Sequence, residues 1–550
     1  MTAETHTAEP VAPYRSTAAA GRDGLPALVR SEWTKFRTVR GWTAGMALAA
    51  LITVLIGLLG PLGTSSQCES SGGGGGGHPC GASQPALGPD GQPVSDTFSF
   101  VHRPVTGDGG ITVRLTSMRG YYQGANAAPA ESLADMRQRL EPWARAGIVV
   151  KASTRPGAPY VAVVVTGANG VRMESDFSSS EPALGGRRTG STVSPSSPQW
   201  LRLSRTGDSF TGYLSADGTH WTAVGSKTVR GIPSRAQAGM LVSSPDHGSV
   251  SHQFGGTSVD SSPSVAVAAF DHVGFAGAWT GGSFAAPPAT GQDAGPAGSA
   301  LVRNTYTRSG GEYRVEGSGD IAPGTAATVG DAKSLESALI GVFAGLIAVV
   351  AVAVLTITSE YRRGLIRSTF SATPRRGAVL AAKSTVVGAV GFAVGLVSAG
   401  IAVPLVRAMN TAKGSYVLPA SAGAEARVVV STAVLLALVA VFAVAAGTLL
   451  RRGAGAVAAV IALVVLPYVL ATASVLPAGA SEWLLRLTPA AGFAVQQTLA
   501  VYPGYAEAAS GYTPAAGYYP LAPWAGLAVT AAYAALAAGL AWYALRRRDV

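Results

Sequence analysis

The sequence lacks a Walker A nucleotide-binding loop. Its nearest string, Gly225-Ser-Lys-Thr228, has the wrong glycine spacing and lies in a segment with β-strand patterning. If this chain takes part in an energy-driven process, the energy must therefore come from another chain.

Charged residues are absent from long stretches and make up only 13% of the 550 residues. Six uncharged apolar segments are each long enough to cross a hydrocarbon core of about 30 Å as a helix. Because no span has Asp, Glu, Lys, Arg or His in its interior, the sequence predicts no proton or sodium relay. The fold class predicted is an α-helical polytopic membrane protein with spans at residues 43–62, 338–357, 384–406, 428–450, 453–476 and 521–545.

Lys and Arg are distributed unequally between the two predicted faces of the membrane. With the N-terminus inside, the inner segments hold 17 Lys and Arg and six Asp and Glu, and the two shorter outer loops hold four Lys and Arg. The positive-inside rule then places both termini in the cytoplasm and residues 63–335 outside. Since the inner face accounts for the whole net charge of +11, a basic rim against anionic lipid explains that charge, and nucleic acid is not an expected partner.

An amphipathic helix is predicted before the first span. Val29, Trp33 and Phe36 recur at helical spacing, with Arg30 and Arg37 on another face. This pattern is typical of a helix lying in the membrane interface. The alternative is a cytoplasmic extension of the first span.

The large outer region is rich in Gly, Ser, Pro and Thr, with short alternating segments between turn signals. This pattern predicts an all-β sandwich inserted between spans 1 and 2. The candidate strands are residues 111–115, 147–152, 160–165, 171–177, 200–204, 209–214, 219–224, 238–242 and 265–275. The segment around 313–320 either completes the sandwich or begins a further β piece.

Five short segments occur in a characteristic order: Trp143 to Val150, Tyr160 to Val165, Trp200 to Leu203, Gly212 to Trp221 and Phe270 to Val273. In this order residues 96–275 resemble the concanavalin-like jelly-roll modules found beside glycoside hydrolases. The resemblance implies a carbohydrate-binding or structural role. The candidate glycan-contacting aromatics are Trp143, Trp200, Tyr213 and Trp221, with core packing as the alternative. Glycoside hydrolysis is not expected, because no acid pair is recognisable among Glu141, Glu174, Asp176 and Asp217.

Cys68 and Cys80 are the two cysteines of the chain and flank a run of six glycines. Outside the cytoplasm they can pair as a disulfide that closes a loop near the membrane, or both can remain free.

The connector between spans 2 and 3, residues 356–383, is short and strongly basic. Ser359 can cap a short helix, Arg363 and Arg367 share a helical face, and Thr373-Pro374 favours a new helix start. These helix start and turn signals predict a short helix across the membrane face. The alternative is an ordinary basic loop that anchors the chain at the membrane.

Three motifs on the inner side carry a family resemblance. The segments Ser31 to Arg40, Ser359 to Thr369 and Ala372 to Lys383 resemble the permease subunits of type-2 ABC exporters. The resemblance implies a coupling helix that docks on an ATPase subunit, with the coupling surface at Glu360, Tyr361, Arg362, Arg363, Gly364 and Arg367. It also implies that Glu32, Trp33, Lys35, Phe36 and Arg37 lie on the inner amphipathic helix, and that Trp483 to Phe493 forms helices on the outer side.

The function expected from this resemblance is the permease subunit of an ATP-driven exporter, and the chain is not expected to be an enzyme. No cofactor is expected in this chain, because ATP and Mg bind the separate ATPase subunit. The expected partners are that ATPase, a second permease copy as a homodimer or a paired permease, the bilayer of the plasma membrane, and a glycan or cell wall. The alternative function is an envelope-anchored carbohydrate or cell-wall receptor without transport. The expected organisation is a cytoplasmic segment 1–41, span 1 at 42–62, the outer region 63–335 and the remaining spans within 336–550.

Overall fold

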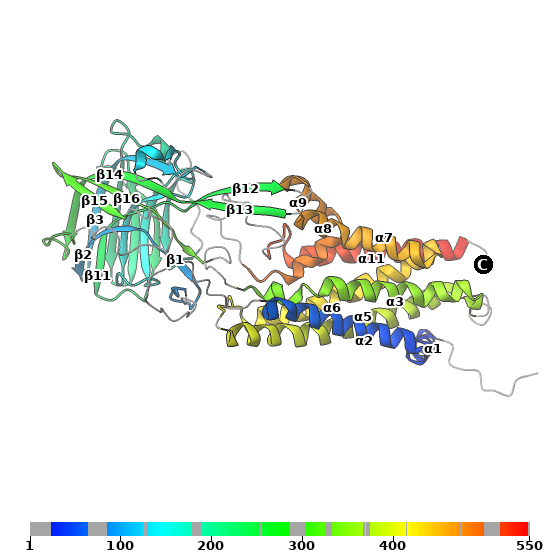
Figure 1. The fold of residues 1–550 in the computed structure, drawn as a ribbon. Helices are drawn as coiled ribbons and strands as arrows, with labels where there is room; N and C mark the ends of the chain where they lie inside the picture. The colour runs from blue at the N-terminus through cyan, green and yellow to red at the C-terminus, as the bar shows by residue number, and fades with distance from the viewer. Residues whose placement is uncertain are drawn as a thin grey trace, which may run out of the picture.

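The computed structural model describes residues 24–63, 85–124, 130, 132–178, 190–253, 256–285, 304–324, 333–366, 369, 375–413, 415–473, 476–499 and 517–547. A sheet-rich region and a region of long helices lie end to end (Figure 1). The C-terminal end, helix α1 (Leu25–Thr38), the end of α3 (Val342–Arg362) and the start of α5 (Arg376–Ala412) all lie at the end of the helices farthest from the sheets.

Six helices in the described part of the chain are long and apolar enough to cross a membrane. Most of these helices are longer than the predicted spans. The two helices that flank the connector at residues 356–383 extend into it. They are α2 (Arg40–Gly63), α3 (Val342–Arg362) preceded by the 3-10 turn η3 (Leu335–Leu339), α5 (Arg376–Ala412), α6 (Ala422–Leu450), the pair α7 (Gly453–Val464) and α8 (Leu466–Thr472), and α11 (Pro523–Arg547).

Small residues let these helices approach closely. A Cβ placed on Gly345 of α3 would lie 1.9 Å from the Thr53 hydroxyl of α2, and one on Gly395 of α5 would lie 2.6 Å from the Cα of Ala433 on α6. Such contacts are typical of membrane helices, where association depends on packing and not on expulsion of water. The apolar sequence therefore fixes the length of the helices, and its glycines fix where they meet.

The predicted fifth span is divided. Helix α7 ends at Val464 and α8 begins at Leu466, with Pro467 in its first turn. Proline lacks the amide hydrogen that would continue the upstream helix, so a break at this position has a local cause.

Helix α9 (Ala478–Leu487) and the 3-10 segment η4 (Pro489–Gln496) lie between α8 and α11. They cover the stretch from Trp483 to Phe493 in which outer helices were expected. Every residue of η4 is buried, and the Phe493 ring lies 4.3 Å from that of Phe343 on α3.

Two antiparallel sheets form the sandwich. The larger follows the order β10 (Thr222–Thr228), β9 (Ser209–Ser215), β8 (Gln199–Thr206), β3 (Gly109–Tyr122), β14 (Ser264–Gly277), β16 (Glu312–Gly317) and β15 (Thr305–Ser309), with β4 (Arg137–Gln138) paired to β3. The smaller follows β2 (Ser99–Thr106), β11 (Arg235–Ser243), β5 (Arg145–Lys151), β6 (Tyr160–Thr166) and β7 (Val171–Ser175). Inward-facing aliphatic side chains of both sheets form the core.

The β-sandwich is confirmed, and each of the nine predicted strands overlaps an observed one, although the strand predicted at 219–224 begins only at Thr222. The sandwich also extends past the predicted end at residue 275. Strand β16 pairs with β14, so the segment around 313–320 completes the sandwich. Strand β1 (Val94–Asp96) then pairs with β17 (Ile321–Pro323) and brings the two ends of the inserted region together. A hairpin of β12 (His247–Gln253) and β13 (Gly256–Ser262) reaches from the sandwich toward the helices (Figure 1).

Candidate functional site at the basic end of the helices

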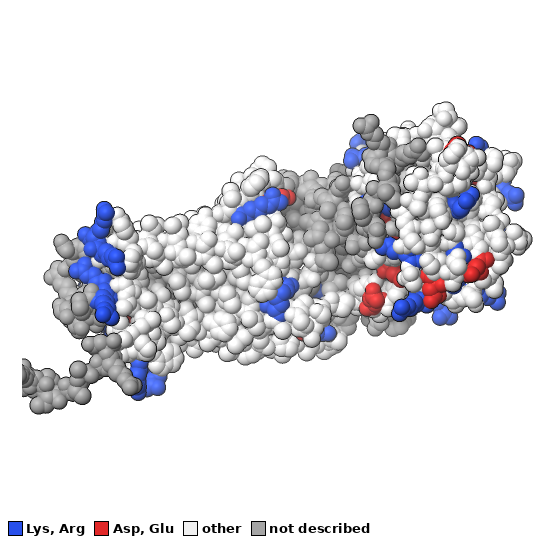
Figure 2. Space-filling model, turned by 180° about the vertical axis from the view of Figure 1, so that it is seen from behind, with Lys and Arg blue, Asp and Glu red and all other residues white. Residues whose placement is uncertain are grey.

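The end of the helical region remote from the sandwich carries many exposed cations, and we call it the basic end. Figure 2 shows Lys and Arg gathered there, followed by a broad band with few charges and then a sandwich surface of mixed sign. The side chains that contribute are Arg30, Arg37, Arg40, Arg362, Arg363, Arg375, Arg452, Arg546 and Arg547, all exposed.

A cluster of four charged side chains lies just inside this end. It consists of Glu32 and Lys35 from α1 (Leu25–Thr38), Glu360 from the last turns of α3, and Lys383 from the first turns of α5. We call it the Glu32–Lys383 cluster. The Lys383 ammonium lies 2.6 Å from Glu32 Oε2 and 3.0 Å from Glu360 Oε1, and the Lys383 side chain is 2% exposed.

Lys35 completes the cluster from the solvent side. Its ammonium lies 2.7 Å from Glu32 Oε1 and 3.6 Å from Glu360 Oε1, and its side chain is 39% exposed. Two carboxylates thus share two ammonium groups, and the cluster has no net charge. A buried charge requires such pairing, because desolvation of an unpaired ion is costly.

The pKa values of Glu32 and Lys35 on α1 are shifted by this ion pairing. Burial by itself would raise the pKa of Glu32, but attraction to Lys383 and hydrogen bonds from Lys35 and Lys383 outweigh it and lower that pKa below its usual value. Burial would lower the pKa of Lys35, yet the hydrogen bond and charge of Glu32, with the charge of Glu360, raise it. Both shifts favour the ionised cluster near neutral pH.

The turn that follows α3 is exposed and ends the helix sharply. Gly364 adopts a φ of +69°, a left-handed conformation that glycine reaches without strain, and its amide donates to the carbonyl of Tyr361. Arg362, Arg363, Gly364 and Leu365 are all exposed. Four consecutive residues are therefore available for contact with a partner at the basic end.

The residues predicted to form the coupling surface differ in exposure. Arg362, Arg363 and Gly364 are exposed, while Tyr361 is half-buried with the Arg451 guanidinium 5.3 Å from its ring centroid. Glu360 must be corrected: it is 5% exposed and faces Lys383 inside the bundle, so it is not a surface residue. Arg367 lies outside the described residues. Between α3 and α5, Leu365, Ile366 and Thr369 are helical.

The predicted amphipathic helix is observed as α1, but its buried face differs from the predicted one, which contained Val29, Trp33 and Phe36. Phe36 is buried and Trp33 is 46% exposed, with their rings stacked at 6.4 Å. Glu32 lies on the buried face with Phe36, while Arg37 is exposed.

Lys383 and the buried role of Glu32 were missing from the predicted site residues. A signal for both is present in the sequence. Glu32 and Phe36 are four residues apart, so they share a face of one helix. An acid on the face that an aromatic buries requires a cation, and Lys383 at the start of a span could supply it.

The four candidate glycan-contacting aromatics do not lie in one place. Trp200 and Tyr213 lie on the outer face of the larger sheet, and Trp221 lies 3.9 Å from the Arg202 guanidinium. Trp143 is 5% exposed, which fits the packing alternative. The glycan role of the other three stays a prediction.

Two further expectations concern cysteines and metals. Cys68 and Cys80 lie outside the described residues, so their pairing stays a prediction. Within the described ranges, no three His, Cys, Asp or Glu side chains are grouped so as to hold a metal ion.

Comparison with known proteins does not place the chain in a family. No family model and no curated protein matches it. A protein of unknown function from Saccharomyces cerevisiae has 12% identity and a TM-score of 0.20, over 36% of this chain and 83% of its own. The Bacillus licheniformis GH43 protein BlXynB has 16% identity and a TM-score of 0.15, over 24% of each chain. Scytalido-glutamic peptidase has 11% identity and a TM-score of 0.23, over 40% of this chain and 98% of its own. TM-scores of this size carry no argument about function.

Proposed function

We propose that this chain is the membrane-spanning subunit of an ATP-driven ABC transporter that works as an exporter, with ATP hydrolysed by a separate subunit. The observation that carries the proposal is the Glu32–Lys383 cluster, which joins α1, α3 and α5 directly behind an exposed basic turn. A partner that displaces this turn would move three elements together, because separating them would expose buried charges.

The proposed orientation has the basic end in the cytoplasm and the sandwich outside the cell, in the plasma membrane. The concentration of Arg at the basic end supports it through the positive-inside rule. The band with few charges in Figure 2 is where the hydrocarbon core would lie. The inserted sandwich would then be an outer module of the concanavalin-like jelly-roll type.

The proposed docking surface is the turn at Arg362, Arg363 and Gly364. Arginine suits this role because its guanidinium forms paired hydrogen bonds with carboxylates on a partner surface. The ATPase subunit would bind ATP and Mg, and two permease chains, identical or paired, would act with two ATPase subunits.

The experiment is co-purification of the tagged full-length chain from its own membranes, followed by ATP hydrolysis measurements in lipid nanodiscs. We expect a stoichiometric ATP-binding subunit with a Walker A loop. We expect the Arg362→Glu/Arg363→Glu variant to lose that subunit and its ATPase activity, since charge reversal opposes an acidic docking surface.

The matched control is Arg546→Glu/Arg547→Glu, which reverses two exposed charges at the same end but on α11. This control should retain the ATPase. Equal ATPase recovery from both double variants, with both inserted normally, would reject the docking assignment.

A further inference from the structure

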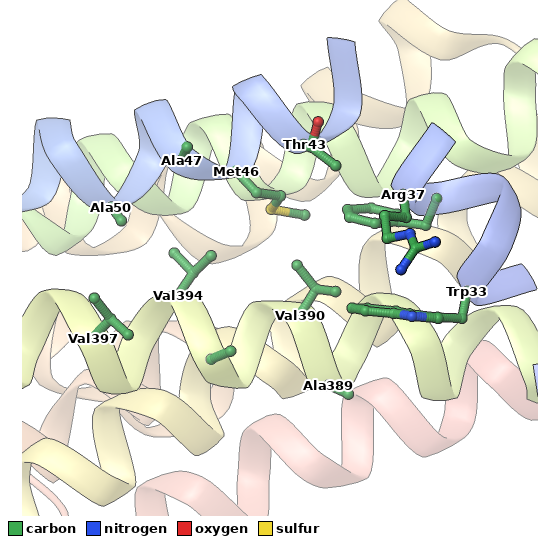
Figure 3. Close-up of a pocket in the computed structure, with 12 residues that line it drawn as sticks. Trp33, Arg37, Thr43, Met46, Ala47, Ala50, Ala389, Val390, Val394 and Val397 are labelled. Carbon is green, nitrogen blue, oxygen red and sulfur yellow. The ribbon is translucent and has the colours of Figure 1, made fainter. Parts of the chain in front are cut away.

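An apolar groove opens at the side of the helices close to the basic end. It lies between the α1–α2 corner and α5, and has a volume of about 440 Å³ (Figure 3). One wall is lined by Met46 and Ala50 of α2, and the opposite wall by Val394 and Val397 of α5. Trp33 and Arg37 of α1 lie at its mouth.

Small side chains leave room for the groove. Ala47 and Ala50 on α2 and Ala389 and Ala393 on α5 line it, and longer side chains at these positions would fill part of the space. Val397 is 53% exposed, so the groove is open to the surroundings of the helices. If these helices span a membrane, those surroundings are lipid chains.

The mouth of the groove has an uncompensated positive charge. Glu32 is the one acidic residue of α1, and it is engaged by Lys35 and Lys383. Arg37 is exposed and enters no ion pair with any residue that the structure describes. Figure 3 shows its guanidinium between α1 and the Trp33 ring, which faces α5.

We propose that this groove binds an anionic phospholipid of the inner leaflet, with one acyl chain between α2 and α5 and the phosphate against Arg37. The inference rests on the membrane placement in the proposed function, but not on an ATPase partner. Charge complementarity identifies the ligand: basic pockets between spans at the cytoplasmic side are suited to anionic headgroups.

Selectivity must come from the headgroup. A lipid chain is as apolar in the bilayer as in the groove, so its transfer gives little net free energy. The Arg37 guanidinium attracts a lipid with a net negative charge more strongly than a zwitterionic lipid, which has no net charge. Trp33 supplies the amphipathic ring typical of the interface. The groove should therefore prefer phosphatidylglycerol over phosphatidylcholine with the same chains.

The test is native mass spectrometry of the full-length chain purified in detergent with an equal mixture of palmitoyl-oleoyl phosphatidylglycerol and phosphatidylcholine. We expect Arg37→Gln to reduce the ratio of retained phosphatidylglycerol to phosphatidylcholine about fivefold, the factor that one basic residue contributes near an anionic headgroup. Arg30→Gln, on the same helix but outside the groove, should leave the ratio unchanged. Ala393→Leu should reduce retention of both lipids by filling the groove.

Two results would overturn the proposal. One is an unchanged lipid ratio in Arg37→Gln while its thermal midpoint matches that of the parent chain. The other is that two copies of the Val397→Cys variant cross-link and retain no phosphatidylglycerol, which would place a second copy in the groove. Because no ATPase is present in this assay, its outcome is separate from that of the co-purification experiment.

Discussion

Both regions of the molecule contain buried ion pairs, and these connect different kinds of segment. In the sandwich, Arg145 on β5 is fully buried and pairs with Glu174 on β7 and with Asp320, while Lys151 pairs with Asp96. Asp96 and Asp320 lie at the two ends of the inserted region. These pairs therefore fasten both ends of the insertion to one central strand.

The Glu32–Lys383 cluster instead connects three helices at one end of a bundle. Its members come from α1, α3 and α5, and the turn after Glu360 is exposed to solvent. The sandwich pairs close a domain on itself, whereas the helical cluster joins elements on either side of a surface that a partner can reach. Under the proposed function, the sandwich would be a fixed outer module, and α1, α3 and α5 would move as one unit on the inner side.

The largest expected effect is from Lys383→Met. The change removes the buried cation between Glu32 and Glu360 and leaves only the partly exposed Lys35 near the two carboxylates, which should cost about 3–5 kcal/mol of stability. Thermal unfolding of the detergent-solubilised chain measures it. Lys35→Met is the matched control and should cost about 1 kcal/mol or less, because the Lys35 side chain is 39% exposed and partly solvated. Equal losses in both variants would contradict the central place of Lys383.

The counterpart in the sandwich is Arg145→Met. It removes the cation shared by Glu174 and Asp320 and should cost about 3 kcal/mol, somewhat less than Lys383→Met because Asp320 is 24% exposed. The Arg145→Met/Lys383→Met double variant should show additive losses, since the two networks share no partner. A coupling above about 0.5 kcal/mol between the two changes would show that the regions are not energetically separate.

Acidification should affect the two regions with opposite sign. The pKa of Glu32 is lowered in the folded chain, so its stabilising contribution is present above the unfolded value of 4.5 and is lost as pH falls through the lower folded value. Burial raises the pKa of Asp176 in the sandwich, so its penalty is present at neutral pH and disappears as pH falls toward 3.8.

Thermal midpoints between pH 7 and pH 3 test this contrast. The destabilisation caused by Glu32→Gln should shrink as pH falls. The midpoint of the parent chain should improve relative to that of Asp176→Asn over the same range. The same trend in both pairs would show that one of the two assignments has the wrong sign.

The smallest effects are expected at two glycines in left-handed turns. Gly364 after α3 and Gly310 between β15 and β16 have φ of +69° and +57°, with open space where a Cβ would lie. Substitution by Ala should cost about 1 kcal/mol at each, from backbone strain alone. We expect only Gly364→Ala to reduce ATPase activity as well, because only that turn is on the proposed docking surface. Equal activity in both variants would argue against docking there.

Much of the architecture could be predicted from periodicity and the absence of charge. The six apolar segments correspond to helices, and alternation identified nine strands. The helix ends at the connector could not be placed this way, because Glu360 and Lys383 are charged and the length criterion ends a span at the first charge. The burial of Glu360 and Lys383 depends on the ion pair between these two residues, which are 23 residues apart in sequence, and on Glu32, which is more than 300 residues from either.

The sandwich shows the same limit. β16 lies beyond a segment without strand patterning, so its pairing with β14 could not be inferred from neighbouring residues. The aromatic residues were recognised, but their faces were not: Trp143 is buried, while Trp200 and Tyr213 share the outer face of one sheet. Alternation along a strand shows which residues share a face, but it does not show which strands of the other sheet, loops or side chains will cover that face.

The most direct test of the central claim is site-specific photo-cross-linking from position 363 in intact cells. A photoreactive residue in place of Arg363 should cross-link an ABC ATPase subunit, because this side chain is exposed on the proposed docking turn. The same residue in place of Trp483 is the control, since Trp483 is 59% exposed on α9 at the sandwich end of the helices. An ATPase adduct at position 363 alone is the predicted result. An adduct at 483 but not at 363, or an ATPase adduct at neither position in a chain that inserts normally, would contradict the account.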